Sequence, residues 1–240
     1  MYGYGMGYGF YGLDWTILLV LVGALISMWA QGRVTSTFTK YSKVRSRTGM
    51  TGADAAMRLL HSQGIYDVSV RPVSGNLTDH YDPRSKTVNL SESVYHATSV
   101  AAIGVAAHEC GHAMQHNEGY APLGFRSALV PVVNFGSKLS WPLILIGFLF
   151  GGVGSTLCQV GILLFTLVVL FQLVTLPVEF NASGRAVKLL DSQGILAGEE
   201  VQGTQKVLGA AALTYVAAAA TTILQLLRLI ILFGGRRRDD

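Results

Sequence analysis

The sequence predicts a mainly α-helical membrane protein with about four transmembrane helices and a smaller domain that includes the edge of a short β-sheet. Charged residues make up only 13% of the 240 residues, against about 25% in typical soluble domains, and the mean hydropathy is +0.42. The uncharged residues are also gathered in long runs, and a bilayer core of about 30 Å is crossed by about 20 helical residues.

The first uncharged run extends from Trp15 to Ala30, near the lower limit of about 17 residues for a transmembrane helix. A leader rich in Gly and Tyr precedes it (residues 1–12), and its aromatic side chains together with Trp15 are suited to the membrane interface. A cleaved signal peptide is the alternative. Because the leader has no Lys or Arg and no A-x-A site follows the run, we favour a retained anchor.

The second run is longer than one span requires. No charged residue occurs in the 40 positions from Leu139 to Val178. As a single helix this run would be about 60 Å long, roughly twice the thickness of the hydrocarbon core. The glycines between Gly151 and Ser155 supply a hinge, so the run predicts a hairpin of two transmembrane helices.

A third apolar region, Val207 to Phe233, is rich in alanine and contains Arg228, which could extend its charge to the interface from near a helix end. The sequence leaves two interpretations open for this region: a fourth transmembrane helix, or a helix buried in the folded domain.

The flanking charges predict the orientation. Basic residues follow the first span and are absent from the leader, which the positive-inside rule interprets as a cytoplasmic location for residues 33–138 and 179–206. Lys138, Arg185 and Lys188 fall on the same side if the hairpin forms, whereas the terminal Arg236–Arg238 would lie outside after a fourth span. No pattern of interleaved basic and aromatic residues indicates nucleic acid, so we expect no nucleic-acid partner. The two cysteines, Cys110 and Cys158, form no disulfide framework, and we expect both to be buried.

The region before residue 100 has the turn and strand signals of a small folded domain. Thr51 and Asp54 form a capping box that opens a helix, which Gly64 ends. Alternating apolar residues between Val68 and Leu90, separated by turn signals, predict a small sheet edge. We expect Ser99 to cap the next helix, and the strand from Lys86 to Leu90 could bind an unfolded substrate by strand addition.

The helix that follows Ser99 contains His108-Glu109-Cys110-Gly111-His112. Two histidines four residues apart project from one helix face about one turn apart, and two neutral imidazoles at this spacing can bind one Zn²⁺. Glu109 follows the first histidine, where its carboxylate can reach water at the metal rather than the metal itself. The motif therefore predicts a zinc site in which Glu109 is the general base.

A catalytic zinc needs a third protein ligand. The metzincin pattern would place a histidine six residues after His112, but that position is Glu118. His116 continues the same helical ladder, and three histidines over two turns of a straight helix cannot all converge on one ion. The remaining candidate is Glu179, which ends the long apolar run, because a carboxylate where a span emerges needs a partner such as a cation.

The segment Asp79 to Pro83 offers donors for a developing oxyanion, which a peptidase needs besides its zinc. His80 and Tyr81 point in opposite directions if the segment is extended, so only one of them should face the site. A turn with a packed tyrosine is an equal alternative for this segment.

These motifs resemble the membrane gluzincins, which include the HtpX heat-shock proteases and the CAAX prenyl-protein proteases. The resemblance is closer to the YugP-like membrane zinc metallopeptidases of bacteria, and it covers about Lys40 to Arg228. It rests on four segments: Leu77–Pro83, Ala106–His112, Tyr120–Leu123 and Leu176–Ser183. The resemblance implies a zincin-like catalytic domain, with His108, His112 and Glu179 as zinc ligands and Glu109 as catalytic base. Ser183 stands where the wider gluzincin pattern has an Asp that orients a ligand histidine, and Asn181 is a second candidate for that role.

The predicted organisation and function follow from these features. We expect a bacterial multi-pass membrane enzyme that contacts the lipid bilayer and cleaves membrane or unfolded protein substrates near the cytoplasmic face. A site-2-type intramembrane protease fits less well, because the apolar stretch before His108 is too short to cross. A membrane scaffold with a non-catalytic zinc is the non-enzyme alternative. The predicted segments are a leader (1–12), a first span (13–32), a cytoplasmic domain (33–138), a hairpin (139–178), a third-ligand segment with a helix (179–206), a fourth helix (207–233) and a charged tail (234–240).

Overall fold

The computed structural model describes residues 14–151 and 155–234; the leader, most of the glycine hinge (152–154) and the charged tail from residue 235 lie outside this part of the chain. Its elements in chain order are α1 (Ile17–Tyr41), α2 (Gly52–Ser62), β1 (Ser69–Val73), β2 (His80–Asp82), β3 (Thr87–Ser91), α3 (Glu92–Tyr95), α4 (Val100–Asn117), α5 (Ala121–Gly151), α6 (Thr156–Ser192) and α7 (Glu199–Gly234).

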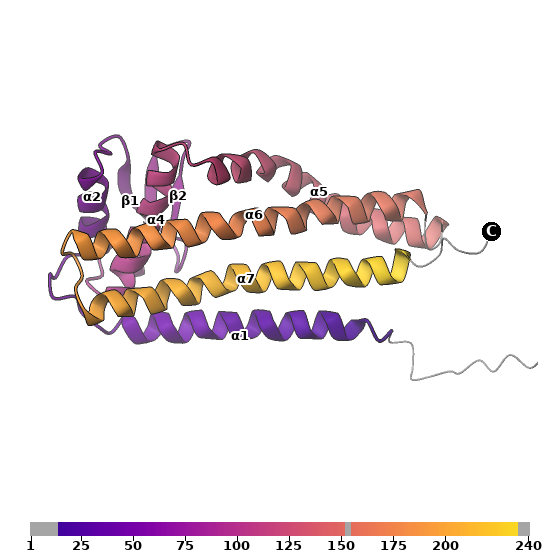
Figure 1. The fold of residues 1–240 in the computed structure, drawn as a ribbon, viewed down its shortest axis with the longest axis horizontal. Helices are drawn as coiled ribbons and strands as arrows, with labels where there is room; N and C mark the ends of the chain where they lie inside the picture. Colours follow the sequence, from indigo (N-terminus) through magenta and orange to yellow (C-terminus); the bar gives the residue numbers. More distant parts are fainter. Residues whose placement is uncertain (1–13, 152–154, 235–240) are drawn as a thin grey trace, which may run out of the picture.

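In the part of the chain that the structure describes, four helices are long and apolar enough to cross a membrane: α1, α5, α6 and α7. Figure 1 shows α1, α6 and α7 side by side along the long axis, with the small folded domain at one end. Only 11–22% of the residues in their most apolar stretches are buried, as expected for helices with surfaces that face lipid. The predicted fold class, a mainly helical membrane protein with about four spans and a small sheet, is confirmed. The region from Val207 to Phe233 belongs to the fourth of these helices.

The two helices of the hairpin extend beyond the uncharged run. α5 begins at Ala121 instead of residue 139 and passes through Pro131 and Pro142, and α6 continues through residue 179 to Ser192 without a break. The helix that we expected to follow the third-ligand segment is therefore the end of α6. The uncharged run located only the apolar part of each helix, because backbone hydrogen bonding continues where hydropathy ends. Figure 1 shows the first half of α5 standing away from α6 and its second half alongside α6.

Small residues allow α5 and α6 to pack closely in the hairpin. A Cβ atom at Gly161 would lie 2.6 Å from Ile144 Cγ1 and 2.8 Å from the carbonyl oxygen of Ser140, and one at Gly147 would lie 2.6 Å from the nitrogen of Cys158. Close approach of this kind is how transmembrane helices gain packing energy in lipid. Both cysteines are buried, as predicted.

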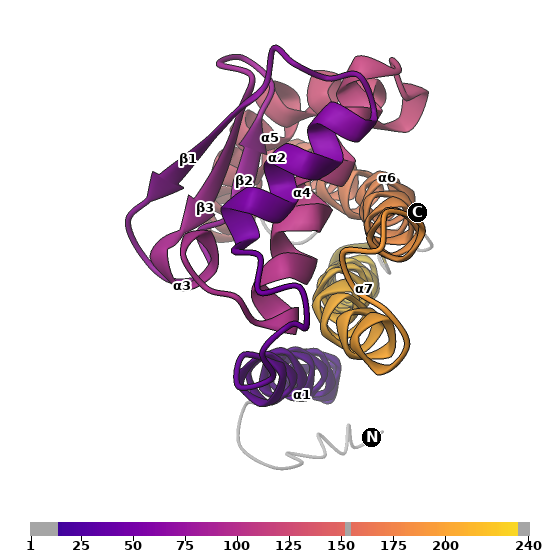
Figure 2. The ribbon, with the colours of Figure 1, turned by 90° about the vertical axis from the view of Figure 1, so that its left-hand side faces the viewer.

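The folded domain is built around α4. Figure 2 shows α4 with the sheet and α2 on one side and α6 and α7 on the other. The predicted caps are confirmed: Thr51 and Asp54 form the capping box of α2, Gly64 adopts a positive φ of 70° after it, and the Ser99 hydroxyl accepts a hydrogen bond from the Ala102 nitrogen at the start of α4. The sequence signals therefore located the motif helix correctly.

The sheet has the strand order β1-β3-β2, with β1 parallel and β2 antiparallel to β3. The strand at Lys86 to Leu90 is therefore the central one, and both of its edges are already paired. Strand addition at this segment, which the sequence suggested as possible, is therefore ruled out. Both β2 and β3 contact α4, and the edge strand β2 comes from the segment of His80 and Tyr81.

Candidate metal centre

α4 presents the two histidines of its motif towards α6. The helix is buried over most of its length, and Gly111 lies against the backbone of Ala182. A Cβ atom at Gly111 would lie 2.6 Å from the carbonyl oxygen of Ala182, so glycine is required for α4 and α6 to approach this closely. The close approach places the C-terminal part of α6 beside the motif.

His108, His112 and Glu179 meet between these two helices. The distance from Glu179 Oε2 to His108 Nε2 is 3.3 Å, and the distance to His112 Nε2 is 3.6 Å. One potential ligand atom from each of the three residues lies within 4.8 Å of the others. The structure therefore brings together the three residues that the sequence suggested as metal ligands, although 67 positions separate His112 from Glu179.

The carboxylate of Glu179 uses its two oxygens differently. Oε1 accepts a hydrogen bond of 3.1 Å from Arg126 Nη1, an ion pair supplied by α5. Oε2 is buried and accepts no hydrogen bond from the described residues, although the side chain is only 3% exposed. A buried carboxylate oxygen without a partner is costly, so a cation at this position would satisfy it.

The hydrogen bonds on the far side of each imidazole indicate which nitrogen carries the proton. The Nδ1 atom of His112 lies 3.0 Å from Gln115 Oε1, and Gln115 Nε2 donates to the carbonyl oxygen of Val178 and to Asn181 Oδ1, both at 2.9 Å. With the amide oriented in this way, His112 Nδ1 must be the donor, which leaves a lone pair on Nε2.

His108 is held in the same manner. Its Nδ1 atom lies 3.0 Å from the hydroxyl of Ser183, which stands where the wider gluzincin pattern has an Asp. If Nδ1 donates to this hydroxyl, the Nε2 atoms of both histidines and Glu179 Oε2 offer lone pairs to one another without a proton between them. Such a donor set fits Zn²⁺, which prefers imidazole nitrogen and carboxylate oxygen and whose histidines are oriented by outer hydrogen bonds of this kind.

Glu109 lies beside the three residues but is not one of them. It is buried, and its Oε2 atom accepts a hydrogen bond of 2.9 Å from the backbone nitrogen of Tyr81. Among the described residues Oε1 has no hydrogen-bond partner. Edge strand β2 therefore fixes one oxygen of the carboxylate and leaves the other for a proton.

His80 and Tyr81 both contribute to the wall of the cavity above the three residues. That one of the two side chains faces the reacting atoms stays a prediction. Tyr81 contributes through its backbone to Glu109, while its hydroxyl lies 2.8 Å from His116 Nδ1. Burial raises the pKa of the Tyr81 phenol to about 12, so it keeps its proton at neutral pH. His80 lies farther out, with Nε2 3.2 Å from Asn89 Nδ2. His116 is exposed and does not belong to the group of three potential metal ligands, as expected.

A cavity of about 610 Å³ opens over the site, and its wall includes residues that sequence reasoning missed. Arg126 comes from α5, Tyr215 from α7 and Gln115 from α4. Arg126 had a detectable signal, because it is the only charged residue between Glu118 and Lys138, and such a residue in an apolar helix needs a partner. Nothing in the sequence marked Tyr215 or Gln115.

Fold and site together define the class of protein: a membrane protein with a metallopeptidase motif helix whose two histidines face a glutamate from a transmembrane helix. The chain belongs to the family described as "Putative neutral zinc metallopeptidase", whose family model matches residues 16–234. It is similar to the "Putative membrane protease YugP" of Bacillus subtilis (strain 168), with 52% identity over 201 residues that cover 84% of this chain and 88% of the relative. No solved structure matches the chain. The resemblance to the YugP-like family is thereby confirmed.

Proposed function

We propose that this protein is a zinc-dependent endopeptidase that hydrolyses peptide bonds of membrane or membrane-proximal proteins. The observation that carries the proposal is the cluster itself: His108 and His112 of α4 and Glu179 of α6 each place one potential ligand atom within 4.8 Å of the others, next to the buried Glu109. In this proposal the first three residues bind zinc. A bound Zn²⁺ would supply Lewis acidity, which polarises a substrate carbonyl and makes water a better nucleophile.

The residues around the cluster divide the remaining work. Glu109 takes a proton from the attacking water at Oε1 and returns it to the leaving amide nitrogen, while the Tyr81 nitrogen holds Oε2 in place. His80 and Tyr81 belong to the cavity wall, and in this proposal one of them donates a hydrogen bond to the oxyanion. The cavity above them is large enough for an extended peptide segment.

A scaffold with a structural zinc is the alternative, and the surroundings of Cys110 disfavour it. Structural sites usually have four protein ligands, often including cysteine. The Cys110 thiol is fully buried and lies 3.6 Å from the carbonyl oxygen of Ala56, on the side of α4 that faces α2. Three ligands leave a position open for water or substrate, which favours catalysis.

The test separates zinc binding from chemistry. Purified protein should hold about one zinc per chain, and metal analysis of His108→Ala and Glu179→Ala should show its loss. Glu109→Gln should retain zinc and lose turnover by about 10²–10⁴-fold on a panel of membrane proteins. Undiminished zinc in Glu179→Ala would remove the third ligand from the proposal. Normal turnover in Glu109→Gln would remove the proposed base.

We also propose that the site faces the cytoplasm, because basic residues cluster just beyond the first span on the side of the folded domain. Single cysteines at Ser85, in the exposed loop before β3, and at Thr156, at the start of α6, report the two sides in a background without Cys110 and Cys158. An impermeant reagent added to intact cells should label only the cysteine at position 156. Labelling of both cysteines, or of position 85 alone, would contradict this orientation.

A further inference from the structure

The uncharged part of α1 indicates how deep the site lies in the bilayer. Asp14 and Arg33 enclose 18 uncharged residues, about 27 Å of helix, which is close to the thickness of a hydrocarbon core. Trp15 and Trp29 are exposed near the two ends of this stretch, where tryptophans favour the membrane interface. The level of Trp29 to Arg33 therefore marks the bilayer boundary on the side of the folded domain.

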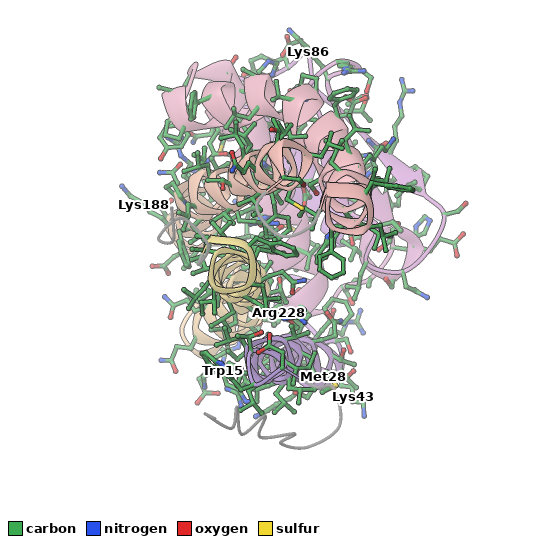
Figure 3. The ribbon with its side chains drawn as sticks, turned by 90° about the vertical axis from the view of Figure 1, so that its right-hand side faces the viewer. Trp15, Met28, Lys43, Lys86, Lys188 and Arg228 are labelled. Carbon is green, nitrogen blue, oxygen red and sulfur yellow. The ribbon has the colours of Figure 1, made fainter. Side chains whose placement is uncertain are left out.

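The register between α1 and α7 transfers this level to α7. Thr221 Oγ1 donates to the carbonyl oxygen of Gly23 and lies 3.0 Å from the Ser27 hydroxyl. Near the other end of the pair, Arg228 Nε donates to Thr16 Oγ1 at 3.3 Å, and Figure 3 shows Arg228 between α7 and α1. The two helices are antiparallel, so a step towards the start of α7 runs beside a step towards the end of α1. Moving six residues back from Thr221 on α7, or six residues forward from Gly23 or Ser27 on α1, covers about 9 Å along the helix axis in each case.

Tyr215 is the residue six positions before Thr221, so it lies level with positions 29 to 33 of α1. Tyr215 lines the same cavity as Glu109 and Glu179, and the metal cluster is therefore at the bilayer boundary or just inside it. α6 gives an independent measure: Thr156 to Val178 are 23 uncharged residues, about 35 Å of helix, and Glu179 is the first charge that follows.

The first half of α5 forms the wall of the cavity on the apolar side. Arg126, its only charged residue before Lys138, turns inward to Glu179, and Leu123 and Val130 line the cavity. Phe125 and Phe135 are turned outward and are 58% and 66% exposed, as suits contact with lipid. One wall of the cavity is thus apolar helix, and another, at β2 and α4, belongs to the folded domain.

From this position, and resting on the proposed function, we propose that the scissile peptide bond lies where a substrate's transmembrane helix emerges from the bilayer. The substrates are then membrane-anchored chains cleaved within a few residues of their span, and soluble unfolded proteins are poor substrates. A span anchored in the bilayer holds its emerging residues at the level of the cluster. A soluble chain would have to carry its polar backbone to the apolar boundary, which costs free energy.

The first arm of the test measures depth without using activity. In a background with Cys110 and Cys158 replaced by alanine, a nitroxide is attached at Phe180→Cys, an exposed position next to the cluster, in full-length protein in liposomes. References are Leu163→Cys, exposed in the middle of α6, and Ser85→Cys in the folded domain. The ratio of oxygen to water-soluble nickel accessibility at position 180 should lie between the references. A value equal to that of position 85 would overturn the inference.

The second arm uses a membrane substrate found in the panel and inserts 0, 4, 8 or 16 Gly/Ser residues between its span and the cleaved segment. Eight extended residues displace the segment by about 26 Å. We expect kcat/KM at the original bond to fall at least tenfold with eight residues, and any remaining cleavage to move towards the span. Unchanged cleavage at every length, or equal cleavage of the segment without its span, would overturn the inference while the proposed peptidase stands. If the label lies at the boundary and no substrate is hydrolysed, the proposed function fails and the inference fails with it.

Discussion

The buried amide of Gln115 allows the sharpest test of how the proposed zinc ligands are held in place. Its three hydrogen bonds, at 2.9–3.0 Å, join His112 of α4 to the Val178 and Asn181 positions of α6 that flank Glu179. Gln115→Leu keeps an apolar side chain of similar length and removes all three bonds. His112 Nδ1 then has no fixed acceptor, so its imidazole is free to rotate or to change tautomer.

The size of the effect follows from these contacts. The hydrogen bond between Gln115 and His112, a proposed zinc ligand, is worth about 0.5–1.5 kcal/mol, which corresponds to about 2- to 13-fold in zinc affinity. Loss of a hydrogen bond behind a metal ligand typically costs about 10–100-fold. The two ranges overlap near tenfold, so we expect zinc affinity to fall by about tenfold. The other two bonds hold α4 to α6, so thermal stability without metal should fall as well.

Competition with a chromophoric chelator measures the zinc affinity of Gln115→Leu in detergent. Gln202→Leu, at an exposed position of α7, is the matched control and should bind zinc like the parent protein. A merely structural role would lower the melting temperature and leave the zinc dissociation constant unchanged. That result would refute the orientation of His112 by Gln115.

Two further substitutions probe the same contacts. Arg126→Met should destabilise the metal-free protein by about 3–5 kcal/mol, because it leaves the buried Glu179 carboxylate without its cationic partner. In thermal melting, zinc should therefore stabilise this variant more than it stabilises the parent protein. An equal zinc-induced shift of the melting temperature in both proteins would contradict this account. Gly111→Ala should abolish zinc binding in metal analysis, because the new Cβ would lie 2.6 Å from the Ala182 carbonyl oxygen, whereas Gly184→Ala, with nothing within 4 Å of its new Cβ, should bind zinc normally.

The chemistry of the site was predictable from the sequence because it depends on residue types at fixed spacing. Two histidines four positions apart on one helix must share a face, and Glu179 stood out as a carboxylate at the end of an apolar run. Glu179 could be proposed as the third metal ligand only because a charged side chain at the end of a membrane span needs a partner. The distance between Glu179 and the histidines is a tertiary property that no local pattern encodes.

The parts that sequence reasoning missed depend on packing between distant segments. Tyr215 and Gln115 are ordinary helix residues until α4, α6 and α7 come together around them. α5 continues through Pro131 and Pro142, because neighbouring helices in a bundle can satisfy the freed backbone groups. Strand order also depends on pairing across the sheet, which is why the central position of β3 was not foreseen.

The separation of the cluster between α4 and α6 has a consequence for biosynthesis. The ribosome completes α4, with His108 and His112, before it makes either helix of the hairpin, and Glu179 follows 67 residues after His112. A nascent chain therefore has only two of the three proposed ligands until α5 and α6 have entered the bilayer and returned. If the three residues bind zinc as proposed, the complete site forms only after the hairpin is inserted, and a chain without its hairpin would lack peptidase activity.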